Sequence, residues 1–313
     1  MSSGEAILTN AEAGDGIEFC GLSLAHPVIN GSGTFDAIAA RRAFGAAALE
    51  RDFPFAAFVS KTITLSPRAG NPAPRLWETA GGLINSIGLP NKGLAAYLTE
   101  DLPQLAALPV PLITNVMGSS AEEFSTLVSA CDGRPEIAAI ELNVSCPNVE
   151  TGLDIGADPR QLAQVLAACR TSTRKPLIVK LTPNTADVPA CAAAAQDGGA
   201  DAVSLINTLR AMALSPDRSG ERRPWLGGGT GGLSGPAIRA VALAQVARVA
   251  ARVSIPVVGM GGVQRASHAR DLLDAGATLV AVGTETFRDP TAAARVAGGL
   301  RAVAPAQAVS RTA

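Results

Sequence analysis

A cysteine and two lysines are the residues of this sequence best suited to chemistry. Cys146 lies in the segment ELNVSCPN (141–148), and a cysteine thiolate can act as a nucleophile or accept a proton. Lysine occurs only at positions 61, 92, 175 and 180, although the chain carries 26 lysines and arginines in total. An ammonium is a compact point charge that can approach a ligand closely, whereas guanidinium is wide and planar. Lys61 and Lys180 are therefore candidates for ligand contacts.

Other proton acceptors are scarce. The two histidines, His26 and His268, precede the first predicted strand or lie within a predicted helix, so neither is expected to reach a site made by strand ends. Glu141 is expected to point into the core, and a metal cage is not expected. Cysteines 20, 131, 169 and 191 fit the usual role of free cysteine as a small buried hydrophobe. Cys146 is the best-placed base, and Lys180 could support anionic charge across the site.

The elements that must position these residues are repeated βα units. Runs rich in valine, isoleucine and alanine recur along the chain, each followed by a helix-like stretch. The expected strands are 27–30, 55–61, 111–116, 138–144, 176–181, 201–207, 255–260 and 278–284. The expected helices include 121–130, 159–169, 186–197, 236–252 and 265–274. Eight such units favour an α/β fold of the (β/α)8 TIM barrel type, and a doubly wound open sheet is the alternative.

The segments around these units suggest a single domain over residues 1–313, with 1–15 and 304–313 as flexible tails. Residues 16–27 alternate around Gly21 like a small hairpin, which could plug the bottom of the barrel. Two long connections, 62–110 and 208–234, follow strand ends. Connections of that length are usually lids or binding segments, so both are expected over the C-terminal face.

Polar residues or glycines follow every predicted strand. They are Asn30 and Ser32, Lys61 and Thr62, Asn115, Asn143, Lys180, Asn207 and Thr208, the glycines of GMGGV (259–263), and Gly283 with Thr284. Any one of them could be an ordinary turn or capping residue, but eight sets at one edge favour a binding site. Asparagine offers both a donor and an acceptor, which suits a flat heteroaromatic ligand with carbonyl and N–H groups. The glycines before the last two helices, with GGLSG (231–235), predict a phosphate site.

Net charge, apolar runs and cysteine spacing limit the kinds of partner and the cellular compartment that are expected for this chain. A formal net charge of -1 gives no field that would attract nucleic acid or an anionic membrane. No apolar run approaches the ~20 residues of a membrane span, and the first residues lack the pattern of a signal peptide, so a cytoplasmic protein is expected. Five scattered cysteines without a Cys-x-x-Cys pair indicate neither a disulfide framework nor an iron-sulfur or metal site.

Several longer motifs, in order along nearly the whole chain, resemble the dihydroorotate dehydrogenase family. They are KTITLSPRAGNPAPR (61–75), NSIGLPN (85–91), ELNVSCPN (141–148), VKLTPN (179–184), INTLRAMA (206–213), GGLSGPAI (231–238), GMGGV (259–263) and VGTETFRDP (282–290). A cysteine at the position of Cys146, and no N-terminal membrane-associated extension, resemble class 1 of that family. The chain departs from the family pattern at Ala211 and Ala240, which both lie apart from the expected site.

The resemblance implies roles for individual residues. FMN would contact Ser32, Lys61, Thr62, Asn115, Asn143, Lys180, Ile206, Gly235, Gly261, Gly262, Gly283 and Thr284. Orotate would contact Lys61, Asn85, Ser86, Ile87, Gly88, Leu89, Asn143, Asn148, Asn207 and Thr208. Cys146 would be the catalytic base that takes a proton from carbon 5 of dihydroorotate while a hydride leaves carbon 6 for the flavin. Lys180 would stabilise the charge that develops on the reduced ring.

The resemblance also implies an electron acceptor and partners. The motif forms are most similar to class 1B catalytic subunits, which pass electrons to NAD through a subunit carrying FAD and an iron-sulfur centre. A homodimer, alone or within such a heterotetramer, is expected, and a fumarate-linked class 1A enzyme is the competing interpretation. The residues are also compatible with a dihydropyrimidine dehydrogenase-like flavin enzyme, with an aldolase that forms a Schiff base on Lys180, and with a barrel that binds ligands without catalysis.

Overall fold

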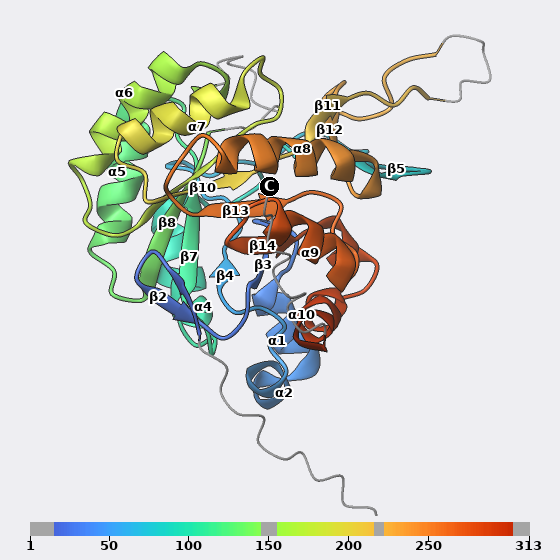
Figure 1. Ribbon diagram of the computed structural model, residues 1–313, viewed down its shortest axis with the longest axis horizontal. Coiled ribbons are helices and arrows are strands. Elements are labelled where there is room, and N and C mark those ends of the chain that lie inside the picture. The colour runs from blue at the N-terminus through green and yellow to red at the C-terminus, as the bar shows by residue number, and fades with distance from the viewer. Residues whose placement is uncertain (1–15, 145–154, 216–221, 303–313) are drawn as a thin grey trace, which may run out of the picture.

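The computed structural model describes residues 16–144, 155–215 and 222–302 (Figure 1). Cys146, Asn148 and the predicted tails 1–15 and 304–313 lie outside these residues. None of the helices within the described ranges is long and apolar enough to cross a membrane.

Eight parallel strands form the centre of the molecule, as the sequence predicts. Their order in the sheet is β3, β14, β13, β10, β9, β8, β7, β4, so the first two strands of the series stand at the two edges and meet to close a barrel. The strands are β3 (Val28–Asn30), β4 (Phe58–Val59), β7 (Leu112–Val116), β8 (Ile137–Asn143), β9 (Leu177–Lys180), β10 (Ala202–Leu205), β13 (Val257–Met260) and β14 (Leu279–Val282).

The closing seam between β3 and β4 depends on a side chain. One backbone bond crosses it, from Ala56 N to Val28 O at 2.9 Å. The Asn30 amide makes two more, because its Oδ1 accepts from Val59 N at 2.7 Å and its Nδ2 donates to Val59 O at 2.8 Å. The Asn30 side chain thus makes the hydrogen bonds that the backbone of a neighbouring strand would otherwise make to Val59. The sequence placed it in the ring around the mouth, whereas the structure uses its amide to close the barrel.

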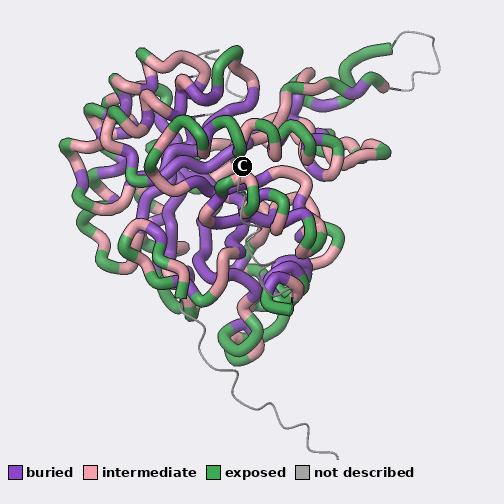
Figure 2. The backbone as a smooth tube through the Cα atoms, in the orientation of Figure 1, coloured by how far each residue is buried: buried purple, intermediate pink, exposed green. Residues whose placement is uncertain are grey.

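The helices form a layer around the barrel, and buried and exposed residues alternate along them (Figure 2). In α5 (Ala121–Asp132) the buried residues Phe124, Leu127, Val128 and Cys131 follow helical spacing. Its N-cap, Ser120, accepts from the Glu123 amide. The remaining helices are α1 (Ala37–Phe44), α2 (Ala46–Arg51), α6 (Pro159–Arg170), α7 (Val188–Asp197), α8 (Arg239–Ala250), α9 (Ala266–Asp274) and α10 (Ala292–Ala302). The predicted helices are confirmed, with ends shifted by up to three residues.

The N-terminal hairpin covers the bottom of the barrel, as expected. It pairs β1 (Ile17–Phe19) with β2 (Leu22–Leu24) in antiparallel register. Phe19 and Leu24 are almost fully buried, and they pack in one cluster with inward-facing strand residues such as Ile29 and Ile113. The hairpin therefore supplies the apolar floor of the barrel interior.

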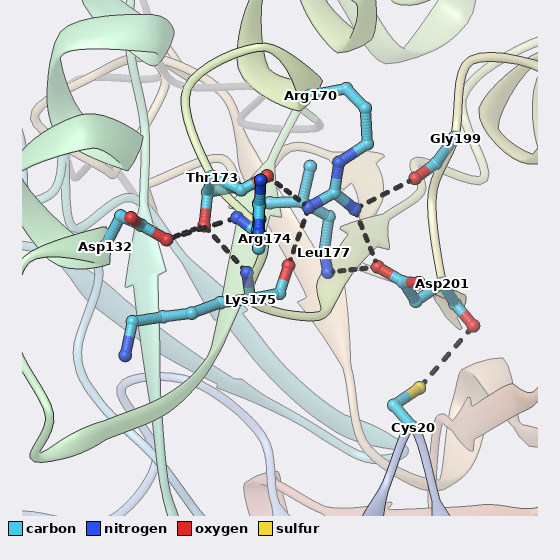
Figure 3. A network of polar contacts seen from close by, with 9 residues as sticks. All are labelled: Cys20, Asp132, Arg170, Thr173, Arg174, Lys175, Leu177, Gly199 and Asp201. Atoms are coloured by element: carbon cyan, nitrogen blue, oxygen red, sulfur yellow. Dashed lines mark hydrogen bonds and ion pairs between the residues drawn. The ribbon is translucent and has the colours of Figure 1, made fainter.

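A polar network also ties together the N-terminal end of the barrel (Figure 3). The Arg170 guanidinium donates to the carbonyl oxygens of Thr173, Lys175 and Gly199 and to the Asp201 carboxylate. That carboxylate also accepts from Leu177 N at 2.8 Å, at the start of β9. The network joins the end of α6 to the starts of β9 and β10, so it fixes where these strands begin.

The two long connections form a second sheet over the C-terminal face instead of irregular loops. Its order is β11, β12, β6, β5, all antiparallel, and it extends beyond the barrel at the upper right of Figure 1. The strands are β5 (Leu76–Thr79), β6 (Gly82–Asn85), β11 (Leu209–Ala211) and β12 (Gly231–Ser234). The first connection also contains α3 (Gly93–Ala96), a π-helical turn (Tyr97–Asp101) and α4 (Leu102–Leu105). Gly232 is required for this pairing, because a Cβ there would lie 1.9 Å from Thr208 Oγ1.

Candidate active site

A cavity of about 390 Å³ lies between the C-terminal ends of the barrel strands and the second sheet. Lys61, Asn143, Lys180 and Met260 line it from the barrel, and Leu83 lines it from β6. This volume is in the usual range for a site that encloses a cofactor-sized ligand. The mouth of the barrel and the long connections that were expected to cover it therefore form one site.

Most of the residues singled out from the sequence lie around this single cavity. Those that line it are Ser32, Lys61, Thr62, Asn85, Ile87, Gly88, Leu89, Asn143, Lys180, Ile206, Asn207, Thr208, Gly235, Gly261, Gly262, Gly283 and Thr284. Ser86 and Asn115 do not line it, and Cys146 and Asn148 lie outside the described residues. The structure thus brings the predicted residues together, while their roles toward a ligand stay predictions.

One end of the cavity is lined by bare backbone. Gly262 has a φ of +68°, and a Cβ at this position would lie 2.8 Å from Gly235 O and 2.9 Å from the Cβ of Arg239. Gly283 directly precedes a 3-10 turn, and Thr284 donates to Ser234 Oγ at 2.8 Å. Glycines before helical turns expose backbone N–H groups, which is the arrangement that binds phosphate in barrels of this kind.

His268 supports this end of the cavity from behind. It is 5% exposed, and its Nδ1 accepts from the backbone N of Gln264, which lines the cavity. Arg265 Nε lies 2.9 Å from its Nε2, and Arg239 also contacts the ring. Burial lowers the pKa of His268, and the two nearby guanidinium groups lower it further. These surroundings disfavour a charged imidazole, and the ring does not reach the mouth, as the sequence suggested.

The two lysines approach the cavity from different depths. Lys180 ends β9 and is 6% exposed, and no oxygen within the described ranges accepts a hydrogen bond from its ammonium. Lys61 is exposed to the open cavity, yet desolvation lowers its pKa, and Arg75 acts in the same direction against the raising effect of Asp36. Among the residues that the structure describes, neither cation has an ion-pair partner, and both face one space, which favours an anionic or electron-rich ligand.

A buried polar group lies in the barrel interior below this cavity. Both oxygens of Glu141 accept a hydrogen bond: Oε2 from Asn115 Nδ2 at 2.5 Å and Oε1 from Ser204 Oγ at 2.7 Å. All three side chains are at most 3% exposed. Glu141 points inward, as expected, and it engages Asn115, which the sequence assigned to the cofactor.

The segment 85–91 forms part of the cavity roof and is held by its neighbours. Ser86 Oγ donates to Thr230 O at 2.9 Å and accepts from Asn71 Nδ2 at 3.0 Å. Asn85 Nδ2 donates to Gly232 O across the pair β6 and β12. The Ser86 hydroxyl is therefore engaged in joining three segments of the roof, although it was assigned to orotate. Ile87, Gly88 and Leu89 remain on the cavity surface.

Three of the described cysteines are poor candidates for a thiolate base. Burial raises the pKa of Cys131 and of Cys169 to about 12, and burial with the nearby Asp201 raises the pKa of Cys20 to about 12. The segment that contains Cys146 leaves the barrel at Val144, whose carbonyl accepts from Gly156 N at 2.8 Å. The described residues Val144 and Gly156 therefore lie next to each other at the end of β8, beside Asn143.

Sequence reasoning missed several cavity residues. Leu76 and Leu83 come from the unpredicted strands β5 and β6, and nothing in their local pattern indicates a site. Gln264, Glu285 and Phe287 also line the cavity. Glu285 and Phe287 belong to the motif VGTETFRDP, so extending the phosphate-site prediction by three residues would have included them.

Comparisons with known proteins agree on one family. Residues 16–303 match the family described as dihydroorotate dehydrogenase. Proteins from Pelobacter propionicus and Trichlorobacter lovleyi are each 46% identical over 285 residues, which cover 91% of this chain and 91% of theirs. A protein from Desulforudis audaxviator is 45% identical over 291 residues, covering 91% of this chain and 90% of its own. All three are named dihydroorotate dehydrogenase B (NAD(+)), catalytic subunit.

A solved structure supports the fold. A DHODH from Eimeria tenella, in complex with ferulenol, superposes with a TM-score of 0.73 at 21% identity. The match covers 91% of this chain and 83% of that one. At this identity the likeness concerns the barrel architecture alone.

Proposed function

This chain belongs to the dihydroorotate dehydrogenase family, and on that basis we propose that it oxidises (S)-dihydroorotate to orotate with bound FMN, in the de novo synthesis of UMP. The observation that carries the proposal is the single cavity in which Lys61, Lys180 and Asn143 face a glycine-lined end. A phosphorylated, flat, carbonyl-rich cofactor and an anionic pyrimidine substrate both match that lining.

The residues present fit FMN. The backbone at Gly261, Gly262, Gly283 and Thr284 would hold its phosphate, because a side chain at Gly262 would clash with Gly235 and Arg239. Ser32, Thr62, Asn143 and Lys180 would hold the ring and its chain, with Asn115 below. When bound, FMN supplies the hydride acceptor for carbon 6 of dihydroorotate.

The protein's own groups would act on charge and protons. Cys146 would take the proton from carbon 5 of the substrate as its thiolate. Lys180 would stabilise the negative charge that forms during hydride transfer, without reorganisation, because it is already desolvated. Lys61 would pair with the substrate carboxylate or a flavin oxygen. Asn85, Asn143, Asn148 and Asn207 would fix the edge of the pyrimidine.

The names of the relatives support a choice of electron acceptor. We propose that electrons pass from this chain to NAD through a partner subunit that carries FAD and an iron-sulfur centre, as in class 1B. A homodimer of this chain within such a heterotetramer is the proposed assembly. The relatives with which this chain shares 45 to 46% identity are named as NAD(+)-linked catalytic subunits.

The test is an anaerobic titration. Purified protein should show the visible band of oxidised flavin, and dihydroorotate should bleach it, whereas dihydrouracil should not. Reoxidation by fumarate in the absence of any partner would favour class 1A. A colourless protein, or one whose lysine is trapped by borohydride, would contradict the proposal.

A further inference from the structure

The chain that continues β4 contains one extra residue where it runs beside β7. Val59 pairs with Ile113 in parallel register, and the next pair along the two chains is Ile63 with Val116. Between these pairs the chain after β4 has three residues, 60–62, whereas β7 has two. An extra residue of this kind is a β-bulge, and bulges next to active sites redirect side chains.

The bulge turns two neighbouring side chains toward the cavity. Successive side chains of a regular strand point to opposite faces, so Lys61 and Thr62 would face opposite ways without it. Both of them line the cavity. Phe58 and Ile63 pack in one hydrophobic cluster, although a spacing of five residues would place them on opposite faces of a regular strand. The extra residue therefore gives the cavity a lysine and a threonine together and returns Ile63 to the core.

The Ser60 hydroxyl takes the place of the Ser60 carbonyl in the ladder with β7. Ser60 N donates to Ile113 O at 2.9 Å, so the next bond of a parallel ladder would run from Asn115 N to Ser60 O. Asn115 N donates instead to Ser60 Oγ at 3.0 Å, and this hydroxyl donates to Lys61 O at 3.2 Å. The carbonyl that is left over accepts from the cavity-lining Ser32 hydroxyl at 2.8 Å. Ser60 is 1% exposed, so water does not compete for these bonds.

We propose that Ser60 is a positioning residue, which holds the bulge and thereby aims the Lys61 ammonium at the carboxylate of the bound substrate. This inference rests on the proposed function, because it takes the substrate to be dihydroorotate, with orotate as the product. It assigns Lys61 to the carboxylate and not to a flavin oxygen. Ser60 does not line the cavity, so it acts through Lys61 and does not itself touch the substrate.

The experiment is a double-mutant cycle of Ser60→Ala and Lys61→Met in the FMN-loaded protein. The measured quantity is the Kd of orotate, followed without turnover by the change that orotate causes in the visible spectrum of the flavin. Lys61→Met should raise this Kd about 10-fold to 100-fold, because a charge-assisted hydrogen bond is lost. Ser60→Ala should raise it about tenfold, because Asn115 N can then pair with the carbonyl of residue 60 and the bulge relaxes. In the Lys61→Met protein, Ser60→Ala should add less than about twofold, since both changes act on one contact.

Thr114→Val is the matched control. Thr114 precedes Asn115 on β7, is 0% exposed, and bonds the Tyr97 hydroxyl at 2.7 Å. Like Ser60→Ala, this change removes a buried hydroxyl, and urea denaturation should show a loss of stability in both variants. The Kd of orotate should stay unchanged in the Thr114→Val protein, because the bulge keeps its own bonds. A rise in Kd equal to that of Ser60→Ala would show a general loss of packing and overturn the inference.

The remaining outcomes separate this inference from the proposed function. If Ser60→Ala raises the Kd of orotate equally with and without Lys61, or if Lys61→Met leaves the Kd unchanged, Ser60 does not act by aiming Lys61 and the inference is wrong. If Ser60→Ala does not fold, Ser60→Cys replaces it in the cycle. Its thiol is a weaker donor and acceptor of similar shape, and it should raise the Kd about threefold when Lys61 is present and not when it is absent. If the parent protein does not bind FMN and orotate, the proposed function itself fails.

Discussion

One lysine precedes strand β9 and another is its last residue, and the two lysines have opposite surroundings. Lys175, just before the strand, donates to Arg134 O at 2.8 Å and to Ile137 O at 2.6 Å. Lys180, at the other end, is 6% exposed and donates to no oxygen within the described ranges. The first ammonium joins β9 to the start of β8, whereas the second faces the cavity.

The same contrast extends to the two ends of the barrel. At the N-terminal end, Arg170 has four acceptors and Asp201 binds both a guanidinium and a backbone amide. At the C-terminal end, Asn115 Oδ1 and the Lys180 ammonium are buried without such partners in the part of the chain that the structure describes. Satisfied buried groups contribute to stability, and unsatisfied ones cost stability that a ligand can restore. The polar groups at the N-terminal end of the barrel therefore serve stability, whereas those at the C-terminal end serve binding.

The largest effect is expected from a pair of cysteine variants. Cys146→Ala should reduce the rate of flavin bleaching by dihydroorotate by about 10² to 10⁴-fold, as expected for loss of a general base, with flavin content unchanged. Cys20→Ala, in the hairpin at the bottom, should leave that rate unchanged. Stopped-flow absorbance measures both. Rapid bleaching in the Cys146→Ala protein would place the base elsewhere.

The next largest effect is expected from substitution of Lys180. Comparison with a Lys175 variant distinguishes a loss of catalytic rate from a loss of stability. Lys180→Met should lower the rate of flavin reduction by about 10² to 10³-fold, because it removes a preorganised charge, but should not destabilise the flavin-free protein. Lys175→Met should lower the free energy of unfolding by about 2 kcal/mol, through two lost hydrogen bonds, with normal flavin reduction. Urea denaturation and stopped-flow absorbance test the pair. Equal loss of stability in both variants would contradict the contrast.

The barrel was predictable from the sequence because its strands are buried on both faces and each is followed by a helix. Short runs rich in valine and isoleucine, such as Leu177–Lys180, are typical of buried strands. Polar residues at the ends of such runs are therefore easy to recognise in the sequence. The positions of Lys61, Asn143 and Lys180 around one cavity followed from strand order alone, because parallel strands all end at the same face.

The second sheet was not predictable in the same way. Its strands have three or four residues each, too few for a periodic pattern, and the pair β6 and β12 joins segments about 150 residues apart in the chain. The structural roles of individual polar side chains could not be predicted from the sequence either. Asn30 closes the barrel and Ser86 joins roof segments, because a side-chain amide or hydroxyl serves the scaffold as readily as a ligand.

A smaller effect, on stability alone, is expected from the Arg170 network. Arg170→Met should lower the free energy of unfolding by about 2 kcal/mol, because four hydrogen bonds are lost from a group that is partly open to solvent. The affinity for FMN should stay the same, since the network lies at the far end of the barrel. Urea denaturation and fluorescence titration measure the two quantities. A change in FMN affinity would show that the two ends are coupled.

The smallest effect concerns acid stability at the bottom of the barrel. Burial lowers the pKa of His26 to about 4, with Arg301 acting in the same direction, and its Nδ1 accepts from Val28 N. The unfolded chain therefore takes up a proton near pH 6.5, while the folded protein does not until about pH 4. The contribution of this group to stability is complete above pH 6.5 and is lost as the pH falls toward 4, by on the order of 1 kcal/mol after solvent screening.

His26→Asn keeps an acceptor for Val28 but does not titrate, so its unfolding free energy should fall less than that of the parent protein between pH 6.5 and 4. Parallel curves for the two proteins over this range, measured by urea denaturation, would show that His26 is not desolvated in the fold.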